Sequence, residues 1–358
     1  MKKICFYLPQ FHDDPLNHEV WGENFTDWVT SQNARPLYAG HNQPLIPAFP
    51  EYDLLKTDGI FERQVGQAVE VGLDSFSFYY YCFDIDRYAL RGPLERFALS
   101  DRVSFPFCVT WANIPWTKSW IGKPNVVIAE QRSDNQFCEF VANDLGNFFC
   151  AKNYLVHQGK PVVGILDTRS IDIRWFRKQL ELVAERLGYS GIYLFSLANE
   201  DYIFDPNIDL YIGWPPGDIG LKNCQSYALL KRIIRSLPSG TINRHLFKYS
   251  RVGSEEVFLD KQIVAAEKIR RSGCPQFSQS ILTGWDNTPR YGYRGYRLEA
   301  ASDEIYIEKT SEILRNNLNS EVPFTFVKAW NEWAEGNIME GVRNSVDYWR
   351  RLKSVLKN

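Results

Sequence analysis

Short apolar runs rich in β-branched and aromatic residues recur along the whole chain. Their hydrophobicity is nearly continuous rather than alternating, which is typical of strands buried on both faces of a parallel sheet. We expect each of these runs to form a strand. The eight runs are Ile4–Leu8, Leu73–Phe83, Phe105–Trp111, Pro161–Leu166, Gly191–Leu197, Ile208–Trp214, Gln279–Trp285 and Phe324–Trp330.

Helical periodicity fills several of the intervals between these runs. The expected helices are Phe61–Val71, Asn135–Cys150, Ile171–Leu187, Tyr227–Leu237, Glu255–Arg271, Asp303–Leu318 and Val346–Leu356. Asp134 stands where an N-cap belongs, and Gly188 stands where a helix C-terminus favours glycine. Eight strands separated mostly by helices or long connections predict the α/β class and a (β/α)₈ barrel. A doubly wound open sheet is the alternative, although no G-x-G-x-x-G follows the first run.

The connection after the first strand is unusually long, from Pro9 to about Thr57, and is rich in Pro, Trp, His and Asn. Loops of this length in compact domains are usually functional. The chain has 358 residues and carries no recognisable linker, repeat or low-complexity segment. We therefore expect residues 1–358 to form one domain.

Net charge and composition argue against several classes of binding partner. The net charge is −2 without a long basic run, which argues against nucleic acid or an anionic membrane as a partner. No stretch of 18 apolar residues predicts a transmembrane helix, and the apolar run after Lys3 is too short for a signal peptide. Seven cysteines without a C-x-x-C pair suggest a reducing compartment, so the expected location is cytoplasmic. The five histidines lack metal-ligand spacing, and no metal or cofactor is expected.

Aromatic and polar residues gather where the predicted strands end. Active sites of such barrels form at the carboxyl ends of the strands, and aromatic rings stack on the flat faces of sugars. Aromatics make up 15% of the chain, so the pattern predicts a cleft with aromatic walls and a floor of carboxylates and amides. The strand ends are Gln10 to Asp13, Tyr79–Tyr81, Trp111 to Trp116, Asn199 to Asp201, Trp214 to Pro216, Trp285 to Thr288, and Trp330 to Gly336.

The strongest single feature is the pair Glu332 and Glu335 after the last strand. Glycosidic cleavage needs two carboxyl groups at one bond, and their pKa values must differ so that one is protonated and one is ionised. Residues three apart on a strand face opposite sides, so both reach one cleft only if the chain turns after Glu332; the small residues Ala334 and Gly336 permit such a turn. A surface acidic loop or a salt-bridged pair is the structural alternative.

Further residues are candidates for sugar binding. Asp286 alternatively forms a turn or helix cap, and the histidines are alternatively structural. Alternation along the strand places at most two of Tyr79, Tyr80 and Tyr81 at the cleft. The candidates are His12, Trp28, His41, Gln43, Tyr79, Tyr81, Trp111, Asn113, Trp285, Asp286, Asn287, Asn331 and Trp333.

Several motifs resemble the WbsX-type proteins of bacterial surface-polysaccharide gene clusters, which are similar to glycoside hydrolase family 99, the endo-acting α-mannosidases and mannanases. The motifs span nearly the full length in order. They are Phe6-Tyr7-Leu8-Pro9-Gln10-Phe11-His12, the segments 21–28 and 40–44, Phe78-Tyr79-Tyr80-Tyr81, Trp111-Ala112-Asn113, Trp285-Asp286-Asn287-Thr288 and Trp330-Asn331-Glu332-Trp333-Ala334-Glu335-Gly336.

The resemblance implies a (β/α)₈ fold, an oligosaccharide or polysaccharide substrate and retention of anomeric configuration without a metal or nucleotide. It implies that Glu332 acts as base on the sugar 2-hydroxyl, which attacks the anomeric carbon to give a 1,2-anhydro sugar, and that Glu335 is the general acid. The sequence departs from the family at Ile114, where the strand-three motif usually has Glu, and at Gly341-Val342, where Pro-Asp is usual.

Two other functions remain open. A glycosyltransferase that uses a sugar nucleotide would need a diphosphate site, often an Asp-x-Asp that holds a metal. Asp84-Ile85-Asp86 has that spacing at a strand end. A non-catalytic glycan-binding barrel would bind sugar but turn nothing over.

Overall fold

The computed structural model describes residues 1–118, 123–198, 204–217, 244–274 and 276–357. The expected helix Tyr227–Leu237 and the strand end Asn199 to Asp201 lie outside the described residues. The other expected strands and helices fall within them.

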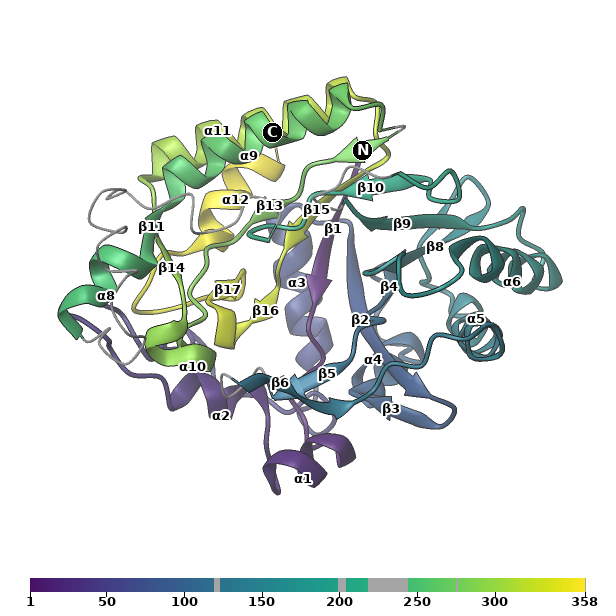
Figure 1. Ribbon diagram of the computed structural model, residues 1–358, viewed down its shortest axis with the longest axis horizontal. Helices are drawn as coiled ribbons and strands as arrows, with labels where there is room; N and C mark the ends of the chain where they lie inside the picture. Colours follow the sequence, from purple (N-terminus) through teal and green to yellow (C-terminus); the bar gives the residue numbers. More distant parts are fainter. Residues whose placement is uncertain (119–122, 199–203, 218–243, 275, 358) are drawn as a thin grey trace.

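A parallel sheet curls into a barrel and confirms the predicted fold class. The strands follow the order β12-β10-β9-β8-β4-β2-β1-β15-β13, and each neighbouring pair along this path is parallel. In Figure 1 the purple β1 therefore lies beside the yellow β15, although they are at opposite ends of the chain. The bounds are β1 Lys2–Tyr7, β2 Ser75–Asp84, β4 Phe107–Trp111, β8 Lys160–Ile165, β9 Tyr193–Leu197, β10 Leu210–Ile212, β12 Phe277–Ser278, β13 Ile281–Leu282 and β15 Phe324–Lys328.

The two ends of this sheet, β12 and β13, belong to one short segment, Phe277–Leu282, which we call the seam. Its first half pairs with β10 and its second half with β15, so the chain itself joins the sheet edges. The expected strand Gln279–Trp285 is therefore broken and ends early. At the break, the Asn317 amide accepts from Gln279 N (2.9 Å) and donates to Gln279 O (2.9 Å), which satisfies the backbone groups that the ladder leaves unpaired.

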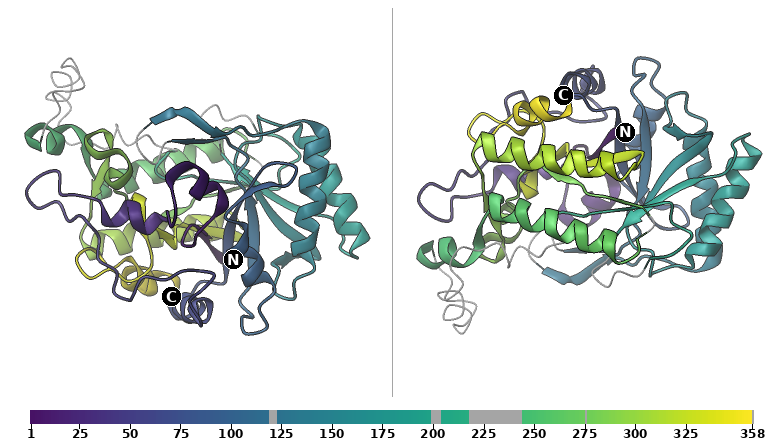
Figure 2. Two further views of the ribbon diagram at one scale, coloured as in Figure 1. Left: turned by 90° about the horizontal axis from the view of Figure 1, so that it is seen from below. Right: turned by 90° about the horizontal axis from the view of Figure 1, so that it is seen from above.

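Amphipathic helices cover the barrel. Asp134 caps its helix by accepting from Phe137 N, and Gly188 has the left-handed φ of 86° expected after a helix. Figure 2 shows α5 and α6 side by side on one flank, and α9 and α11 together on another. The helices that match the sequence pattern are α3 Ile60–Val71, α5 Asn135–Phe149, α6 Ile173–Arg186, α9 Glu255–Arg271, α11 Asp303–Asn319 and α12 Tyr348–Leu356.

Shorter elements decorate the barrel, and several lie at the carboxyl ends of its strands. The shorter elements are α1 Pro15–Trp21, α2 Asp27–Gln32, β3 Arg87–Ala89, α4 Arg91–Ala98, β5 Trp116–Lys118, β6 Lys123–Ala129, β7 Val156–His157, α8 Arg244–Arg251, β11 Val252–Ser254, α10 Thr288–Tyr291, η4 Gly292–Arg294, β14 Arg297–Glu299, β16 Asn331–Glu332, η5 Trp333–Glu335 and β17 Asn337–Ile338.

None of the helices in the described ranges combines the length and apolarity needed to cross a bilayer.

The barrel interior is tightly packed. A Cβ built on Gly164 of β8 would lie 2.4 Å from both Phe195 and Thr110, so a side chain there has no room. The Thr110 hydroxyl is in turn 2.7 Å from that of Ser77 on β2. These contacts fix the spacing of neighbouring strands and hence the positions of the residues that follow them.

Candidate active site

A cleft of about 620 Å³ opens at the carboxyl ends of the barrel strands. Aromatic residues from several strands form its walls, and four charged residues lie in it. The aromatic residues are Tyr79, Tyr81, Trp116, Trp214, Trp285 and Tyr296, and the charged residues are Arg290, Lys328, Glu332 and Glu335. The predicted combination of aromatic walls and carboxylates is thus present at one site.

A turn directly after Glu332 brings both glutamates into this cleft. Glu332 ends β16, and the 3₁₀ turn η5 follows at once and ends with Glu335. Gly336 then adopts a left-handed φ of 60°, and a Cβ there would lie 2.9 Å from the backbone nitrogen of Asp286. Only glycine fits this position, because both the conformation and the space exclude a side chain.

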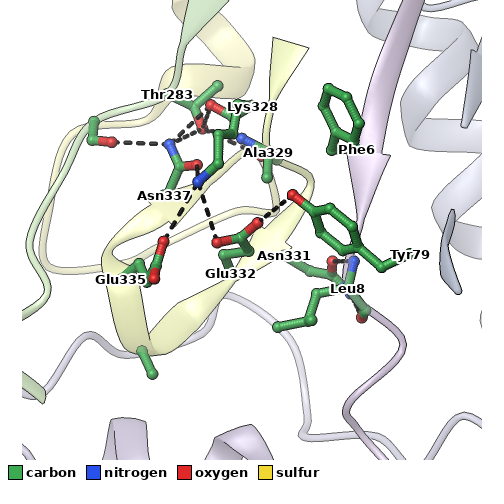
Figure 3. Close-up of polar contacts among 12 residues, drawn as sticks. Phe6, Leu8, Tyr79, Thr283, Lys328, Ala329, Asn331, Glu332, Glu335 and Asn337 are labelled. Atoms are coloured by element: carbon green, nitrogen blue, oxygen red, sulfur yellow. Dashed lines mark hydrogen bonds and ion pairs between the residues drawn. The ribbon is translucent and has the colours of Figure 1, made fainter. Parts of the chain in front are cut away.

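Lys328 lies between the two carboxylates (Figure 3). Its Nζ is 3.3 Å from Glu332 Oε2 and 3.4 Å from Glu335 Oε2. The remaining oxygens have their own donors: the Tyr79 hydroxyl donates to Glu332 Oε1 at 2.8 Å, and Arg290 donates to Glu335 Oε1 at 2.6 Å. Each carboxyl is therefore bound at both oxygens.

The surroundings push the two pKa values apart. Burial raises the pKa of Glu332 above its usual range, and the neighbouring Glu335 charge adds to this against the opposing effect of Lys328. Burial would also raise the pKa of Glu335, but Arg290 and Lys328 outweigh it and hold that pKa below the usual range. Both carboxyls lie within 3.4 Å of the Lys328 ammonium, so their titrations influence each other, and the surroundings favour a proton on Glu332 over one on Glu335.

Arg290 is itself positioned by an ion pair with Asp27 of α2. Its guanidinium is 3.7 Å from Asp27 Oδ1, and Asp27 Oδ2 accepts from the backbone N–H of Ala334. The long first loop thus supports the turn that carries Glu335. This contact gives the loop a structural connection to the site.

Three of the candidate sugar-binding residues, Tyr79, Tyr81 and Trp285, line the cleft. Tyr80 points the other way, and its hydroxyl donates to the Asp144 carboxylate on α5. Two of the three consecutive tyrosines therefore face the cleft, as alternation along a strand requires.

His41, Gln43 and Asp286 come together, but they bind one another. His41 Nδ1 accepts the Leu37 N–H, so its Nε2 carries the proton and donates to Asp286 Oδ2 at 2.7 Å. Gln43 donates to the same oxygen at 2.9 Å, and Thr288 donates twice to Oδ1. All of these residues lie outside the cleft lining, and Asp286 is a turn-stabilising residue rather than a free carboxylate.

Other candidates from the first loop and the early strands also lie away from the cleft. His12 Nδ1 bonds Pro9 O, and the Trp28 indole donates to Tyr52 O. Trp111 is fully buried and faces Phe137 and Phe176 of the helices that cover β4. Asn113 ties down the next loop through both backbone groups of Asp167.

The remaining candidates, Asn331, Asn287 and Trp333, also form contacts that hold the protein framework together. Asn331 bonds both the N–H and the carbonyl of Leu8, which fixes β16 to the end of β1. Asn287 accepts from Tyr296 N, and the Trp333 indole donates to Glu340. The tryptophans beside the carboxylates are instead Trp214 and Trp285, from other strands.

Sequence reasoning missed Lys328 and Arg290. Lys328 carries a signal: it is the one charged residue within the apolar run Phe324–Trp330, and such a residue needs a buried partner. Arg290 follows the Trp285 to Thr288 motif by two residues, and nothing in its local sequence distinguishes it from a surface arginine.

Asp84 and Asp86 lie at the hairpin between β2 and β3. Asp84 is half exposed and pairs with Arg132 at 3.0 Å, and Asp86 has a positive φ in the turn. Neither residue lines the cleft. Across the ranges that the structure describes, no cluster of three or more His, Cys, Asp or Glu side chains is arranged to hold a metal ion.

One protein family and two curated relatives match most of this chain. The family described as Glycosyltransferase WbsX matches residues 3–349. A protein named "Uncharacterized protein WxcX" from Xanthomonas campestris pv. campestris (strain B100) is 27% identical over 344 residues, which are 94% of this chain and 47% of that protein. This chain therefore spans about half the length of the curated relatives that it matches.

Two solved structures share the fold. The GH99 endo-α-mannosidase from Bacteroides thetaiotaomicron superposes with a TM-score of 0.58 at 13% identity, covering 99% of this chain and 96% of that one. A "glycoside hydrolase-like protein" gives 0.59 at 13% identity, covering 99% and 92%. At this identity the likeness establishes the barrel fold alone.

Proposed function

The chain belongs to the WbsX glycosyltransferase family, a family of carbohydrate-active enzymes, and on this premise we propose that it breaks a glycosidic bond in a bacterial surface polysaccharide or its precursor, with retention of configuration. One observation carries the proposal: Glu332 and Glu335 both contact the Lys328 ammonium in an aromatic-walled cleft, and their pKa values are displaced in opposite directions. Acid–base cleavage of a glycoside needs one protonated and one ionised carboxyl at the bond.

In the proposed mechanism, Glu332 takes the proton of the sugar 2-hydroxyl, whose oxygen attacks the anomeric carbon. Glu335 gives its proton to the departing oxygen, and a 1,2-anhydro sugar results. Water then opens this ring: Glu335 takes the water proton, and Glu332 returns its proton to the 2-oxygen. Two inversions at the anomeric carbon give net retention.

In the free enzyme the surroundings favour a proton on the other carboxyl, Glu332. Burial favours a proton on Glu332, whereas Arg290 and Lys328 keep Glu335 ionised. The proposal therefore requires the proton to pass from Glu332 to Glu335 when substrate is bound. Both carboxyls contact the same Lys328 ammonium, so a proton that leaves one has a short path to the other, and its transfer leaves the number of protons on the pair unchanged.

The test compares Glu332→Gln and Glu335→Gln on a natural glycan and on an activated fluoride or aryl glycoside of the same sugar. Loss of a general acid matters most for a poor leaving group, so Glu335→Gln should lose about 10²–10⁴-fold in kcat/KM on the glycan and much less on the activated substrate. Glu332→Gln should be impaired on both.

The control is Glu70→Gln, a half-exposed glutamate that pairs with Lys353 on the outer surface and should keep the wild-type rate. Ligand binding is measured beside the rates to exclude misfolding. If both glutamine variants retain wild-type rates on the glycan, neither carboxyl is catalytic. A reversed dependence on the leaving group would exchange their roles.

The family's description favours a second candidate, transfer from a sugar nucleotide. Release of nucleoside diphosphate that depends on manganese or magnesium would establish it, whereas the hydrolytic proposal expects chelator to leave turnover unchanged. A non-catalytic barrel would instead bind glycan without turnover, and binding would survive loss of both glutamates.

A further inference from the structure

Lys328 is a buried cation with three defined partners. Its side chain is 4% exposed, and its ammonium lies 3.3 Å from Glu332, 3.4 Å from Glu335 and 3.4 Å from Asn337 Oδ1 (Figure 3). An ammonium has three N–H donors. Each donor therefore has an acceptor, and none remains to bind a substrate.

The Asn337 amide is oriented by the backbone around it. Its Nδ2 donates to Gly284 O at 2.9 Å and to Lys328 O at 2.8 Å, so Oδ1 must face the ammonium. The ammonium also lies 5.1 Å from the Trp214 ring centre and 5.0 Å from that of Trp285. These contacts hold the cation at one point at the carboxylate end of the cleft.

The carboxylates are arranged around this point. One oxygen of Glu332 and one oxygen of Glu335 face Lys328, and the opposite oxygens face Tyr79 and Arg290. Two carboxylates that lie beside one cation repel each other, and a positive charge between them favours ionisation of both. Lys328 is the cation shared by both.

We propose that Lys328 is a positioning residue, whose ammonium ties Glu332 and Glu335 to one point and sets the number of protons that the pair carries. The inference deepens the proposed function, since it concerns the same pair. The titration of the pair can nevertheless be measured without substrate.

Several other groups face the pair and remain when Lys328 is replaced. Tyr79 and Tyr81 approach from β2, Arg290 from α10, Asp27 from α2 and Cys5 from β1. Among them only Arg290 is a cation. It pairs with Glu335 at 2.6 Å, whereas Lys328 pairs with both glutamates. Removal of Lys328 should therefore make the last proton of the pair harder to remove.

The experiment uses Lys328→Met and Lys328→Gln, which remove the charge, and Lys328→Arg, which keeps it. Lys353→Met on the outer surface of α12 is the control. The full chain is labelled with ¹³C at the glutamate carboxyl, and Glu332→Gln identifies the signals of the pair by difference. The upper titration step should move to higher pH by about 1–3 units in the neutral variants, the usual effect of a nearby opposite charge.

Lys328→Arg should titrate close to wild type and yet lose kcat/KM, because a planar guanidinium cannot donate in the same three directions. If Lys328→Met does not fold, Lys328→Gln carries the test, since its amide can still donate to one carboxyl. An unchanged upper step in the folded neutral variants overturns the inference. A shifted step in an enzyme whose glutamate variants keep full rates would instead overturn the proposed function and leave the inference standing.

Discussion

The Tyr79 hydroxyl donates a hydrogen bond of 2.8 Å to Glu332 Oε1, which joins the second strand of the barrel to the turn after the last one. Burial and the Glu332 charge raise the pKa of Tyr79, so this phenol stays protonated and can donate its proton to the hydrogen bond. A tyrosine of the sequence motif thus takes part in positioning the carboxyl pair as well as lining the cleft.

We expect Tyr79→Phe to lower kcat/KM about 10- to 100-fold, the scale of one hydrogen bond to a charged group. Tyr80→Phe is the matched control, since its hydroxyl bonds Asp144 on the outside of the same strand. It should lower the free energy of unfolding by about 1 kcal/mol and leave the rate unchanged. Steady-state kinetics and urea unfolding separate the two effects, and an exchange of these outcomes would refute the assignment of the cleft face.

The pH dependence of stability should have opposite signs for the two glutamates. The raised pKa of Glu332 means that its stabilising contribution is present below the unfolded pKa and is lost as pH rises through the folded pKa. We therefore expect Glu332→Gln to gain stability relative to wild type from about pH 4 to about pH 8.

Glu335 has a lowered pKa, so its contribution is present above the unfolded pKa and is lost as pH falls. Glu335→Gln should lose stability relative to wild type as the pH rises from about 2 to about 5, and the difference should stay constant above that range. Unfolding free energies measured in urea at several pH values provide the check. Parallel curves for the two variants would show that the folded protein does not separate their pKa values.

The hydrogen bond between His41 and Asp286 predicts that Asp286 stabilises the fold. Asp286→Asn should lower the free energy of unfolding by about 2–3 kcal/mol, because it replaces a charged acceptor of four hydrogen bonds in a buried cluster. Asp84→Asn at the half-exposed hairpin should change it by less than about 0.5 kcal/mol. A sugar-binding role for Asp286 would appear instead as a higher KM at unchanged stability.

Glycine substitutions test the packing of the barrel. Gly164→Ala should destabilise the protein by about 1–3 kcal/mol, because its Cβ would overlap with Phe195 and Thr110 in the interior. Gly66→Ala in α3 meets nothing within 4 Å and should stabilise by about 0.5–1 kcal/mol, since alanine favours a helix. Thermal unfolding of both variants measures the contrast, and equal effects would argue against the interior placement of Gly164.

The fold could be predicted from the sequence because its signals are local. Continuous apolar runs gave the strands, and Asp134 and Gly188 marked helix ends that the structure has. The break in the seam had no such signal. It depends on Asn317, which lies on α11 and satisfies the backbone of Gln279. A contact between residues far apart in the sequence leaves no trace in the pattern around either one.

The site was partly predictable for the same reason. The turn after Glu332 follows from the small residues Ala334 and Gly336, and the alternation of Tyr79, Tyr80 and Tyr81 follows from strand geometry. The motifs, however, did not show which groups their aromatic and polar side chains contact. His41 and Asp286 were expected to bind sugar, and they bind each other. Membership of a motif therefore does not say whether a side chain contacts the framework or the substrate.

The place of β1 in the sheet also bears on synthesis by the ribosome. Lys2–Tyr7 pairs on one side with β2, and on the other with Phe324–Lys328, which is synthesised much later. During synthesis β1 therefore keeps one edge open until β15 has left the exit tunnel, and an open edge invites pairing with other chains. Closure of the barrel must wait for β15, so the nascent chain carries an unpaired strand edge throughout that interval.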